Sequence, residues 1–316
     1  MTGGAGFGGS HLCIELLKRG AHVYLLDRIV PRNSYLQLSG FVSDVQIVLG
    51  DVRNLDLLKT LIERFRIDVI FHLAAQPLVG PSNVLPLETL DINISGTYSV
   101  LEAMRTTDSC KFMVFASSGG HYGATTRDFP ISEEDIPAPA SNIYGASKSA
   151  ADVIVRAYAQ VYGLNVAACR FMNTYGPGDT NFSRLIPRAI RNLIEQSSYS
   201  FGDRDDGSTR LDFLFIRDMT QAYISVAENL EEVKGEAFNF GSGASRSTAE
   251  VAKLVSIAFD GKDRCPEFSG PSRAVPIVKY LDISKAEARL GWKPSTALHD
   301  GLRETLEWYR RHGVTF

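Results

Sequence analysis

Three glycines close to the amino end constrain the fold of this chain more than any other feature. Gly3, Gly6 and Gly9 open an amphipathic helical pattern, and a short apolar strand pattern that ends in Asp27 follows it. Glycines at this spacing allow a tight turn, in which a pyrophosphate approaches the backbone and sits at a helix N-terminus. Glycines, helix, strand and acid in this order predict a dinucleotide-binding unit.

The acid at the strand end bears on the choice of dinucleotide. The Asp27 carboxylate can accept hydrogen bonds from both hydroxyls of an adenosine ribose, and its charge would repel a 2′-phosphate. This favours NAD over NADP, although Arg28 beside it weakens the preference. Only Met1 and Thr2 precede the glycines. The central strand of the sheet is therefore expected to be a stub that supports its neighbours poorly, unless the natural chain begins earlier.

The composition argues against several other classes of protein. The 316 residues are 44% hydrophobic and 22% charged, with a net charge of −3, and no basic run suggests nucleic acid or an anionic membrane surface. No apolar stretch approaches the roughly 20 residues that span a bilayer, and a signal peptide's charged and apolar regions are missing. The four cysteines and six histidines lack metal-ligand spacing. We expect a cytoplasmic protein with reduced cysteines and no metal.

Strand and helix patterns alternate through the first half of the chain, which is typical of a parallel sheet with crossover helices. Strands are expected over residues 22–27, 45–49, 68–73, 111–116 and 165–171, and helices over 55–65, 88–106 and 143–162. Later patterns predict helices over 182–195, 219–230, 248–259, 284–290 and 298–311, with strands over 211–216 and 238–241. We expect a doubly wound parallel α/β (Rossmann) domain over 1–175 with returns near 211–241, and a smaller C-terminal α/β lobe over 176–210 and 242–316.

Tyr144 and Lys148 lie four residues apart near the start of the expected helix over 143–162, so their side chains share one face. A phenol, with an unperturbed pKa of about 10, is a poor base at neutral pH, and a nearby ammonium lowers that pKa. The pair therefore suits a hydroxyl that must lose or gain a proton. Because the same spacing occurs by chance in many helices, it gains its weight from the dinucleotide motif.

Residues at the ends of the expected strands add candidates. Asp51 follows one strand, where it could meet an adenine amine or serve as a helix cap or turn residue. Ala74 and Ala75 follow another, and their small side chains leave room for a flat cofactor. His72 within the same strand is expected to be a satisfied core residue.

Taken in order, these motifs resemble those of the extended short-chain dehydrogenase/reductases, in particular the NAD-dependent nucleotide-sugar epimerase/dehydratase family. The resemblance runs nearly end to end. It covers residues 2–9, Asp27, 50–52, 72–75, Asn93 with 96–97, 117–118 ahead of 122–123, Tyr144 with Lys148, 170–178, 185–187, 239–243 and 290–294. Locally, residues 72–79 and 181–187 are most similar to the CDP-glucose 4,6-dehydratases.

The resemblance implies roles for matching residues. Tyr144 would be the acid/base at a sugar hydroxyl, Lys148 would hold the nicotinamide ribose and lower the pKa of Tyr144, and Ser118 would hydrogen-bond the same sugar oxygen. The implied NAD contacts besides Tyr144 and Lys148 are Gly3, Gly6, Phe7, Gly8, Gly9, Asp27, Arg28, Asp51, Val52, Leu73, Ala74, Ala75, Asn93 and Ser117. The implied contacts to a nucleoside-diphosphate sugar, besides Ser118 and Tyr144, are Gln76, Gly119, Asn173, Leu185, Ile186, Phe201 and Arg210.

One departure from the family pattern concerns the reaction. The 4,6-dehydratases place an Asp, followed by Glu or Lys, directly after the catalytic Ser or Thr, and these groups move protons at C5 and C6. This chain has Gly119 and Gly120 there, which have no side chain for that work. His121 is either a substitute or a loop residue.

Two further departures concern binding. In relatives an arginine immediately before an Asp-Phe pair clamps the diphosphate, whereas Leu211 precedes Asp212 here and Arg210 lies one place earlier. One position along a strand turns a side chain to the opposite face, so the clamp is kept only if a bulge restores it. Gly8 stands where relatives often carry Ile, and this glycine is expected to loosen the first helical turn.

The residues and the resemblance together favour an NAD-dependent nucleotide-sugar 4-epimerase, which oxidises C4 to a transient 4-keto sugar and returns the hydride to the opposite face. A 4,6-dehydratase or 4-keto reductase with unconventional acid/base groups stays open, as does a catalytically silent NAD-binding relative. Relatives dimerise through a four-helix bundle, so the helices over 88–106 and 143–162 are expected at a homodimer interface, although their faces could also pack within one subunit.

Overall fold

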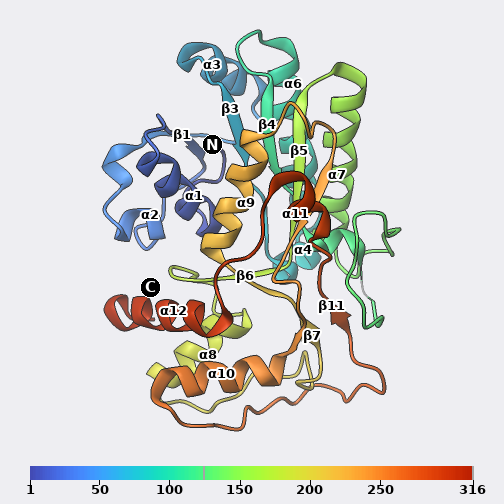
Figure 1. Ribbon diagram of the computed structural model, residues 1–316. Coiled ribbons are helices and arrows are strands. Elements are labelled where there is room, and N and C mark those ends of the chain that lie inside the picture. Colours follow the sequence, from blue (N-terminus) through green and yellow to red (C-terminus); the bar gives the residue numbers. More distant parts are fainter. Residues whose placement is uncertain (124, 315–316) are drawn as a thin grey trace.

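The computed structural model describes residues 1–123 and 125–314. It shows a parallel sheet flanked by helices, with a smaller lobe at one end (Figure 1). The main sheet contains β3 (Val69–His72), β4 (Phe112–Ala116), β5 (Asn165–Phe171) and β9 (Ala237–Phe240), all parallel. Beside it, β1 (Tyr24–Asp27) pairs in parallel with β2 (Gln46–Leu49). The expected α/β class with a parallel sheet is confirmed.

The two groups of strands are joined through the first residues of the chain, with Thr2 between them. Thr2 forms isolated parallel bridges to Leu26 of β1 and to His72 of β3, and its carbonyl oxygen accepts a hydrogen bond from Leu73 N at 3.1 Å. Thr2 is therefore the point at which β1 and β3 are connected in this structure. Beyond it the two strands diverge around an apolar cavity of about 50 Å³, whose lining includes Met1, Tyr24, Leu58, Ile70 and Val100.

His72 is the core residue that the sequence predicts. Its ring is fully buried and hydrogen-bonds the hydroxyls of Thr2 at 2.7 Å and Thr97 at 3.1 Å. Burial lowers its pKa to about 3, with the charge of Lys148 adding to the effect, so the imidazole is neutral.

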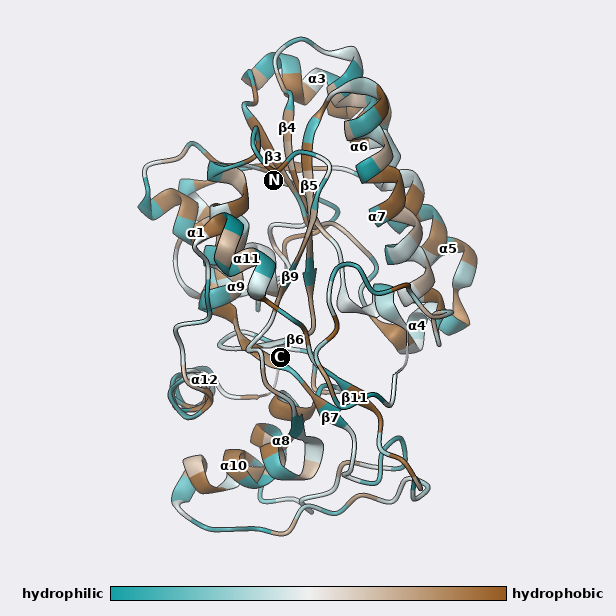
Figure 2. Cartoon of the chain, turned by 45° about the vertical axis from the view of Figure 1, so that its right-hand side comes forward, coloured by the Kyte–Doolittle hydropathy of each residue, from teal (hydrophilic) through white to brown (hydrophobic). Residues whose placement is uncertain are grey.

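Helices cover both faces of the sheet (Figure 2). One face carries α1 (Phe7–Lys18), α9 (Ile216–Glu228) and α11 (Ser284–Leu290). The other carries α3 (Leu55–Phe65), α5 (Pro86–Leu90), α6 (Gly96–Thr106) and α7 (Ile143–Tyr162). Successive residues of β4 and β5 alternate between two separate apolar cores, because side chains along a strand point to opposite faces. Shorter elements are α2 (Tyr35–Leu38), η1 (Val42–Asp44), α4 (Val79–Val84) and η3 (Gly119–Tyr122).

The prediction of a single helix over residues 88–106 is wrong in one respect. A π-helical segment, η2 (Asp91–Ser95), separates α5 from α6. Asn93 lies inside this segment with its side chain buried, and the Thr97 hydroxyl donates to the Asn93 carbonyl oxygen at 2.7 Å. π-Helical turns often occur at functional sites, where they aim a side chain inward.

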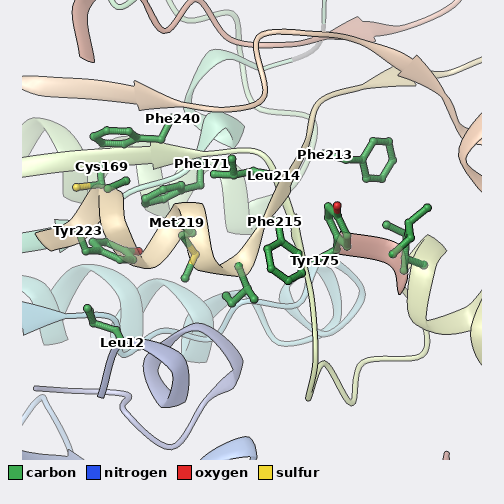
Figure 3. Close-up of a cluster of buried hydrophobic side chains, with 14 of the residues drawn as sticks. Leu12, Cys169, Phe171, Tyr175, Phe213, Leu214, Phe215, Met219, Tyr223 and Phe240 are labelled. Carbon is green, nitrogen blue, oxygen red and sulfur yellow. The ribbon is translucent and has the colours of Figure 1, made fainter. Parts of the chain in front are cut away.

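The core beneath the sheet places α1 against α9. Tyr223 and Met219 of α9 lie between Phe171 of β5 and α1 (Figure 3), with the Phe171 and Tyr223 rings 4.9 Å apart. A Cβ atom at Gly8 would lie 2.8 Å from Cε of Met219. Met219 therefore fills the space that a larger residue at position 8 would need, so the first turn of α1 is packed despite its glycine.

In the part of the chain that the structure describes, the lobe contains two small sheets and three helices. The helices are α8 (Leu185–Ile194), α10 (Thr248–Asp260) and α12 (Leu298–His312). One sheet has the order β10 (Arg246–Ser247), β7 (Arg210–Leu211), β11 (Val278–Lys279), and the other pairs β6 (Asn173–Tyr175) with β8 (Phe213–Phe215).

The strand expected over 211–216 is broken at Asp212, where the chain passes from one small sheet to the other. The Asp212 carboxylate accepts hydrogen bonds from Ser242 N and Ser242 Oγ, both at 2.6 Å, and from Leu281 N at 3.3 Å. This buried carboxylate holds the crossing point in place. Within the described residues, no helix is long and apolar enough to cross a membrane.

Candidate active site

The glycine loop forms a cradle at the start of α1. The first N–H groups of a helix have no partners inside it, and the N-cap residue Gly6 has no side chain to satisfy them. A Cβ atom at Gly9 would lie 2.2 Å from the Gly3 carbonyl oxygen, and one at Gly3 would lie 2.6 Å from Ala74 N. The close backbone approach therefore requires glycine at both positions. Free N–H groups around a small turn fit a pyrophosphate, so these residues fit a bound dinucleotide.

Asp27 closes one side of this cradle. Its carboxylate accepts hydrogen bonds from Ala5 N at 3.1 Å and Arg28 N at 2.9 Å. Burial raises the pKa of Asp27, and these hydrogen bonds oppose the rise. The Arg28 guanidinium lies 3.9 Å from Asp51 and 3.8 Å from Glu88, so its charge is shared between two acids.

Asp51 is a turn residue in this structure and does not cap a helix. Its two oxygens accept hydrogen bonds from Nε and Nη2 of Arg53 at 2.9 and 2.7 Å, and Asn54 provides the cap of α3. Val52 beside it is buried against Gly96, where a Cβ atom would lie 2.7 Å from Cγ2 of Val52. The start of α6 thus packs directly on the loop that follows β2.

Tyr144 and Ser118 meet at the centre of the site. Asn142 caps α7 by accepting from Gly145 N at 2.8 Å, and Tyr144 N donates to Ser82 Oγ at 3.2 Å. Burial raises the pKa of Tyr144, while the nearby Ser118 hydroxyl and the charge of Arg184 oppose the rise. The Ser118 hydroxyl also accepts a hydrogen bond from Gly120 N at 3.0 Å.

Lys148 is buried one turn further along α7. Its ammonium donates to the Ala116 carbonyl oxygen at 2.7 Å and lies 5.0 Å from the centre of the Phe115 ring. Burial lowers its pKa to about 8, and the charge of Asp152 opposes the fall. Lys148 is not among the groups that shift the Tyr144 pKa in this structure, so the expected depression by Lys148 stays a prediction. Burial dominates at Tyr144, and the ammonium is directed to the end of β4.

A buried ion pair behind Lys148 was not singled out from the sequence. Asp152 is fully buried and accepts hydrogen bonds from Arg170 at 3.0 and 2.8 Å and from Ser117 Oγ at 2.6 Å. Burial alone would raise the pKa of Asp152, but the hydrogen bonds and charge of Arg170 hold it below its usual value. The signal was available: Asp152 lies four residues after Lys148 on the same helical face. The Asp152 carboxylate places a fixed negative charge near the Lys148 ammonium.

Three predicted contacts hold the loops of the site together. Asn93 donates to the Gln76 carbonyl oxygen at 3.1 Å and to Ser147 Oγ at 2.8 Å, and accepts from Gln76 N at 2.7 Å. The Gln76 carboxamide is bonded to Leu78 and Thr89, and the Ser117 hydroxyl to Asp152. In this structure these side chains position neighbouring groups, and their contacts with a ligand stay predictions.

Gly119 and Gly120 lie directly beside the Ser118–Tyr144 pair. A Cβ atom at Gly119 would lie 2.5 Å from Sδ of Met172. Met172 thus occupies the space into which a longer side chain at position 119 would extend. His121 is buried, and its Nδ1 has no hydrogen-bond partner within the described residues. Burial lowers its pKa to about 4, aided by the charge of Arg170, so it is a neutral loop residue at pH 7.

The expected sugar-nucleotide contacts lie on the lobe side. Asn173 follows Met172, is exposed, and donates to the Asp212 carbonyl oxygen at 3.1 Å. Leu185 and Ile186 form the first turn of α8. The Phe201 ring is buried and stacked 5.0 Å from that of Phe268.

The arginine clamp is not restored by the break at Asp212. The Arg210 guanidinium donates to Oγ and to the carbonyl oxygen of Ser245, at 3.2 and 3.0 Å. It is therefore used within the lobe.

Arg184 is a second cation that the sequence reading did not single out. It stands at the N-cap position of α8 without a capping hydrogen bond from its side chain, pairs with the buried Asp179 at 2.9 Å, and lies 6.0 Å from the centre of the Phe7 ring in the glycine loop. Its charge also opposes the rise in the Tyr144 pKa that burial causes. Arg184 thus connects the lobe, the glycine loop and the phenol.

The model of the NAD-dependent epimerase/dehydratase family matches residues 1–241. The chain belongs to this family. Over 98% of its length it is 33% identical to the UDP-glucose 4-epimerase of Mycolicibacterium smegmatis, covering 97% of that protein. Its fold matches a Thermotoga maritima UDP-glucose 4-epimerase solved with UDP-glucose, with a TM-score of 0.87, 27% identity and 98% of both chains covered. A Bacillus anthracis dTDP-glucose 4,6-dehydratase solved with NAD matches with a TM-score of 0.86 and 25% identity, covering 98% of this chain and 95% of that one.

Proposed function

We propose that this family member is a nucleotide-sugar 4-epimerase that uses NAD. The observation that carries the proposal is the proximity of the Ser118 hydroxyl to the buried Tyr144 phenol, beside Gly119 and Gly120, which carry no carboxylate. The pair offers acid/base chemistry at one hydroxyl and no carboxylate for a second proton transfer. An inversion that oxidises and reduces a single carbinol carbon needs only the first of these.

The chain's own groups divide the work of binding the cofactor. Gly3, Gly6 and Gly9 would hold the pyrophosphate at the start of α1, and Asp27 would accept from the adenosine ribose. Arg28, whose charge is shared with two acids, is poorly placed to hold a 2′-phosphate, which supports NAD over NADP. When bound, NAD supplies a hydride acceptor that later returns the hydride to the sugar.

Tyr144 would move the proton at the C4 hydroxyl. In the structure its raised pKa keeps the phenol protonated, so the phenol acts as base only when a positive charge is brought nearer. Lys148 has a pKa of about 8 and is therefore still largely an ammonium at pH 7. Ser118 would share a hydrogen bond with the same sugar oxygen and fix its position. The transient product of these steps is a bound 4-keto sugar.

The substrate that we propose is a nucleoside-diphosphate hexose. Asn173, the first turn of α8 and Phe201 are proposed to contact its diphosphate and base from the lobe. The names of the relatives given above refer to UDP-glucose and dTDP-glucose. UDP-glucose and UDP-galactose are therefore the first pair to test, followed by the CDP, GDP and dTDP hexoses.

The test is interconversion of the two C4 epimers, followed by NMR of the sugar. We expect wild type to reach the same mixture from either side without net consumption of NAD, and Tyr144→Phe to retain NAD while losing nearly all turnover. Tyr162→Phe is a matched control, because that tyrosine lies at the exposed end of the same helix. A 4-keto-6-deoxy product would instead assign a dehydratase, and full activity of Tyr144→Phe would remove the phenol from the mechanism.

We also propose that the protein is a homodimer. Large apolar side chains are exposed along α5, α6 and α7, which lie together on one side of the molecule (Figure 2). They include Leu87 at 81%, Tyr98 at 43%, Val153 at 53% and Val161 at 68% exposure. A patch of this kind favours a partner surface. Sedimentation should give a dimer that Val161→Asp weakens, and a wild-type monomer would contradict the proposal.

A cytoplasmic location is proposed from the thiols. All four cysteines are free, and Cys13, Cys110 and Cys169 are buried. Free buried thiols are typical of proteins that reside in a reducing compartment. Immunolocalisation or fractionation of the native protein tests this directly.

A further inference from the structure

A bound diphosphate needs a cation that the lobe does not supply at the expected place. The position directly before Asp212 carries Leu211, and the Arg210 guanidinium is bonded to Ser245. If the protein binds a nucleoside-diphosphate sugar as proposed above, the charge of the diphosphate must be met by another side chain near Leu211.

The neighbouring strand carries such a side chain. β11 runs parallel to β7 in a register that pairs Lys279 with Leu211 and Val278 with Arg210. Side chains of directly paired residues project from the same face of a sheet, and the next pair projects from the opposite face. Lys279 therefore shares a face with Leu211 and not with Arg210. This is the face from which a residue at position 211 projects.

Lys279 is also half-buried and unpaired. Burial alone lowers its pKa, with no carboxylate opposing the shift. No ion pair of Lys279 is present within residues 1–123 and 125–314, whereas Lys285 pairs with Glu236 at 2.9 Å and Lys253 with Asp263 at 3.1 Å. A partly desolvated cation without a partner is costly, and an anionic ligand would relieve that cost.

The backbone connects Lys279 to the candidate site. The Lys279 carbonyl oxygen accepts a hydrogen bond from Asp212 N at 3.0 Å, and the Asp212 carbonyl oxygen accepts from Nδ2 of Asn173 at 3.1 Å. The Asp212 carboxylate accepts hydrogen bonds from Ser242 and Leu281, and among the described residues it makes no ion pair with Lys279. Lys279 thus stands next to the exposed Asn173 region with its charge uncompensated.

We propose that Lys279 binds the diphosphate of the nucleotide sugar, in place of the arginine that position 211 lacks. The cation has moved from β7 to the paired position on the adjacent strand. The inference rests on the proposed function for the presence of a diphosphate, but the binding site that it assigns is specific to this chain.

Isothermal titration with UDP, and then with UDP-glucose, tests the proposal without requiring turnover. Hydrogen bonds to charged groups lead us to expect Lys279→Gln to weaken UDP binding roughly 10- to 100-fold. Lys279→Arg should keep most of the affinity. The double variant Leu211→Arg/Lys279→Gln should regain affinity, because it returns the cation to β7. NAD affinity should be unchanged in all three, which also shows that each variant is folded.

Arg246→Gln is the matched control. Arg246 pairs with Leu211 from the other side, on β10, but it is exposed and already bound to Glu250. Its loss should change UDP affinity by less than about twofold. An equal effect of Arg246→Gln and Lys279→Gln would overturn the proposal, as would wild-type UDP affinity in Lys279→Gln.

Two outcomes distinguish a failure of the Lys279 assignment from a failure of the proposed function. If Lys279→Gln weakens UDP-glucuronate alone and leaves UDP and UDP-glucose unaffected, the lysine reads a sugar carboxylate and the diphosphate assignment is wrong. If wild type binds NAD but none of UDP, CDP, GDP and dTDP or their hexoses, the proposed function itself fails and the role of Lys279 fails with it.

Discussion

Asp152→Asn removes one negative charge from a buried network while keeping the shape of the side chain. Asp152 is fully buried, Arg170 is 2% exposed, and two hydrogen bonds of 3.0 and 2.8 Å join them. In the variant, the amide NH₂ group would face guanidinium N–H donors, and the buried cation would have lost its counter-ion. Removing one partner of a buried pair costs about 3–5 kcal/mol of unfolding free energy.

This loss converts into a measurable shift in melting temperature. Unfolding entropy is about 2.1 cal/mol/K per residue, which for 316 residues gives roughly 0.7 kcal/mol/K. A melting temperature lowered by roughly 5–8 °C is therefore expected by calorimetry. Asp300→Asn is the control, since Asp300 pairs with Arg303 at 3.0 Å on the surface, and should cost less than about 1 kcal/mol. If both variants lower the melting temperature by the same amount, the buried Asp152–Arg170 pair does not stabilise the protein more than a surface pair does.

The same substitution also acts on Lys148. Asp152 opposes the burial that lowers the Lys148 pKa to about 8, so its loss lowers that pKa further. If the ammonium is the active form, kcat/KM falls as pH rises through this pKa. The alkaline limb of the profile should therefore begin below about pH 8 in Asp152→Asn. An unchanged profile would refute the coupling even if the variant were less stable.

Three other predictions concern the cofactor site and pH. Gly9→Ala places a methyl group 2.2 Å from the Gly3 carbonyl oxygen, so NAD affinity measured by titration should fall at least about tenfold. Gly80→Ala, whose added methyl group would meet no atom within 4 Å outside its chain neighbours and its own helix backbone, should leave NAD affinity unchanged. Burial lowers the pKa values of His11, His72 and His121 to about 4, 3 and 4. The folded state thus binds fewer protons than the unfolded state in this pH range. Urea titrations should show the free energy of unfolding falling as the pH drops from about 6.5 to 4. If the free energy of unfolding does not change with pH, the three histidines are not held neutral by burial. Lys148 has a pKa of about 8 in the folded state against 10.5 in the unfolded state, so the free energy of unfolding should rise above about pH 8. Lys148→Met should remove this rise. If the rise persists in the variant, Lys148 is not its source.

Elements with local signals were predicted well from the sequence. The expected helices over 55–65, 143–162 and 284–290 and the strand over 165–171 have the observed bounds. Their ends are set by neighbouring residues. Asn142 caps the start of α7 with its side chain, and Gly163 ends it in the left-handed region at φ 70°. Such signals need no knowledge of the rest of the fold.

Features that depend on tertiary contacts could not be predicted in the same way. The π-helical segment exists around Asn93, whose amide joins Gln76 to Ser147 across the site. The break at Asp212 depends on Ser242, thirty residues away in sequence. The direction of the Tyr144 pKa depends on how deeply the phenol is buried, which the spacing to Lys148 does not report.

The Ser118 region combines both kinds of information. The sequence alone leaves Gly119 ambiguous, because a missing carboxylate can be replaced by a group from elsewhere in the fold. The structure narrows that choice: Met172 fills the adjacent space, and His121 is held neutral by burial. A proton donor at this position would have to displace the thioether or charge a buried imidazole beside Arg170, and both steps are unfavourable. Gly119 and Gly120 offer no carboxylate beside the Ser118–Tyr144 pair, so the pair serves acid/base chemistry at one hydroxyl, which is what a C4 inversion requires.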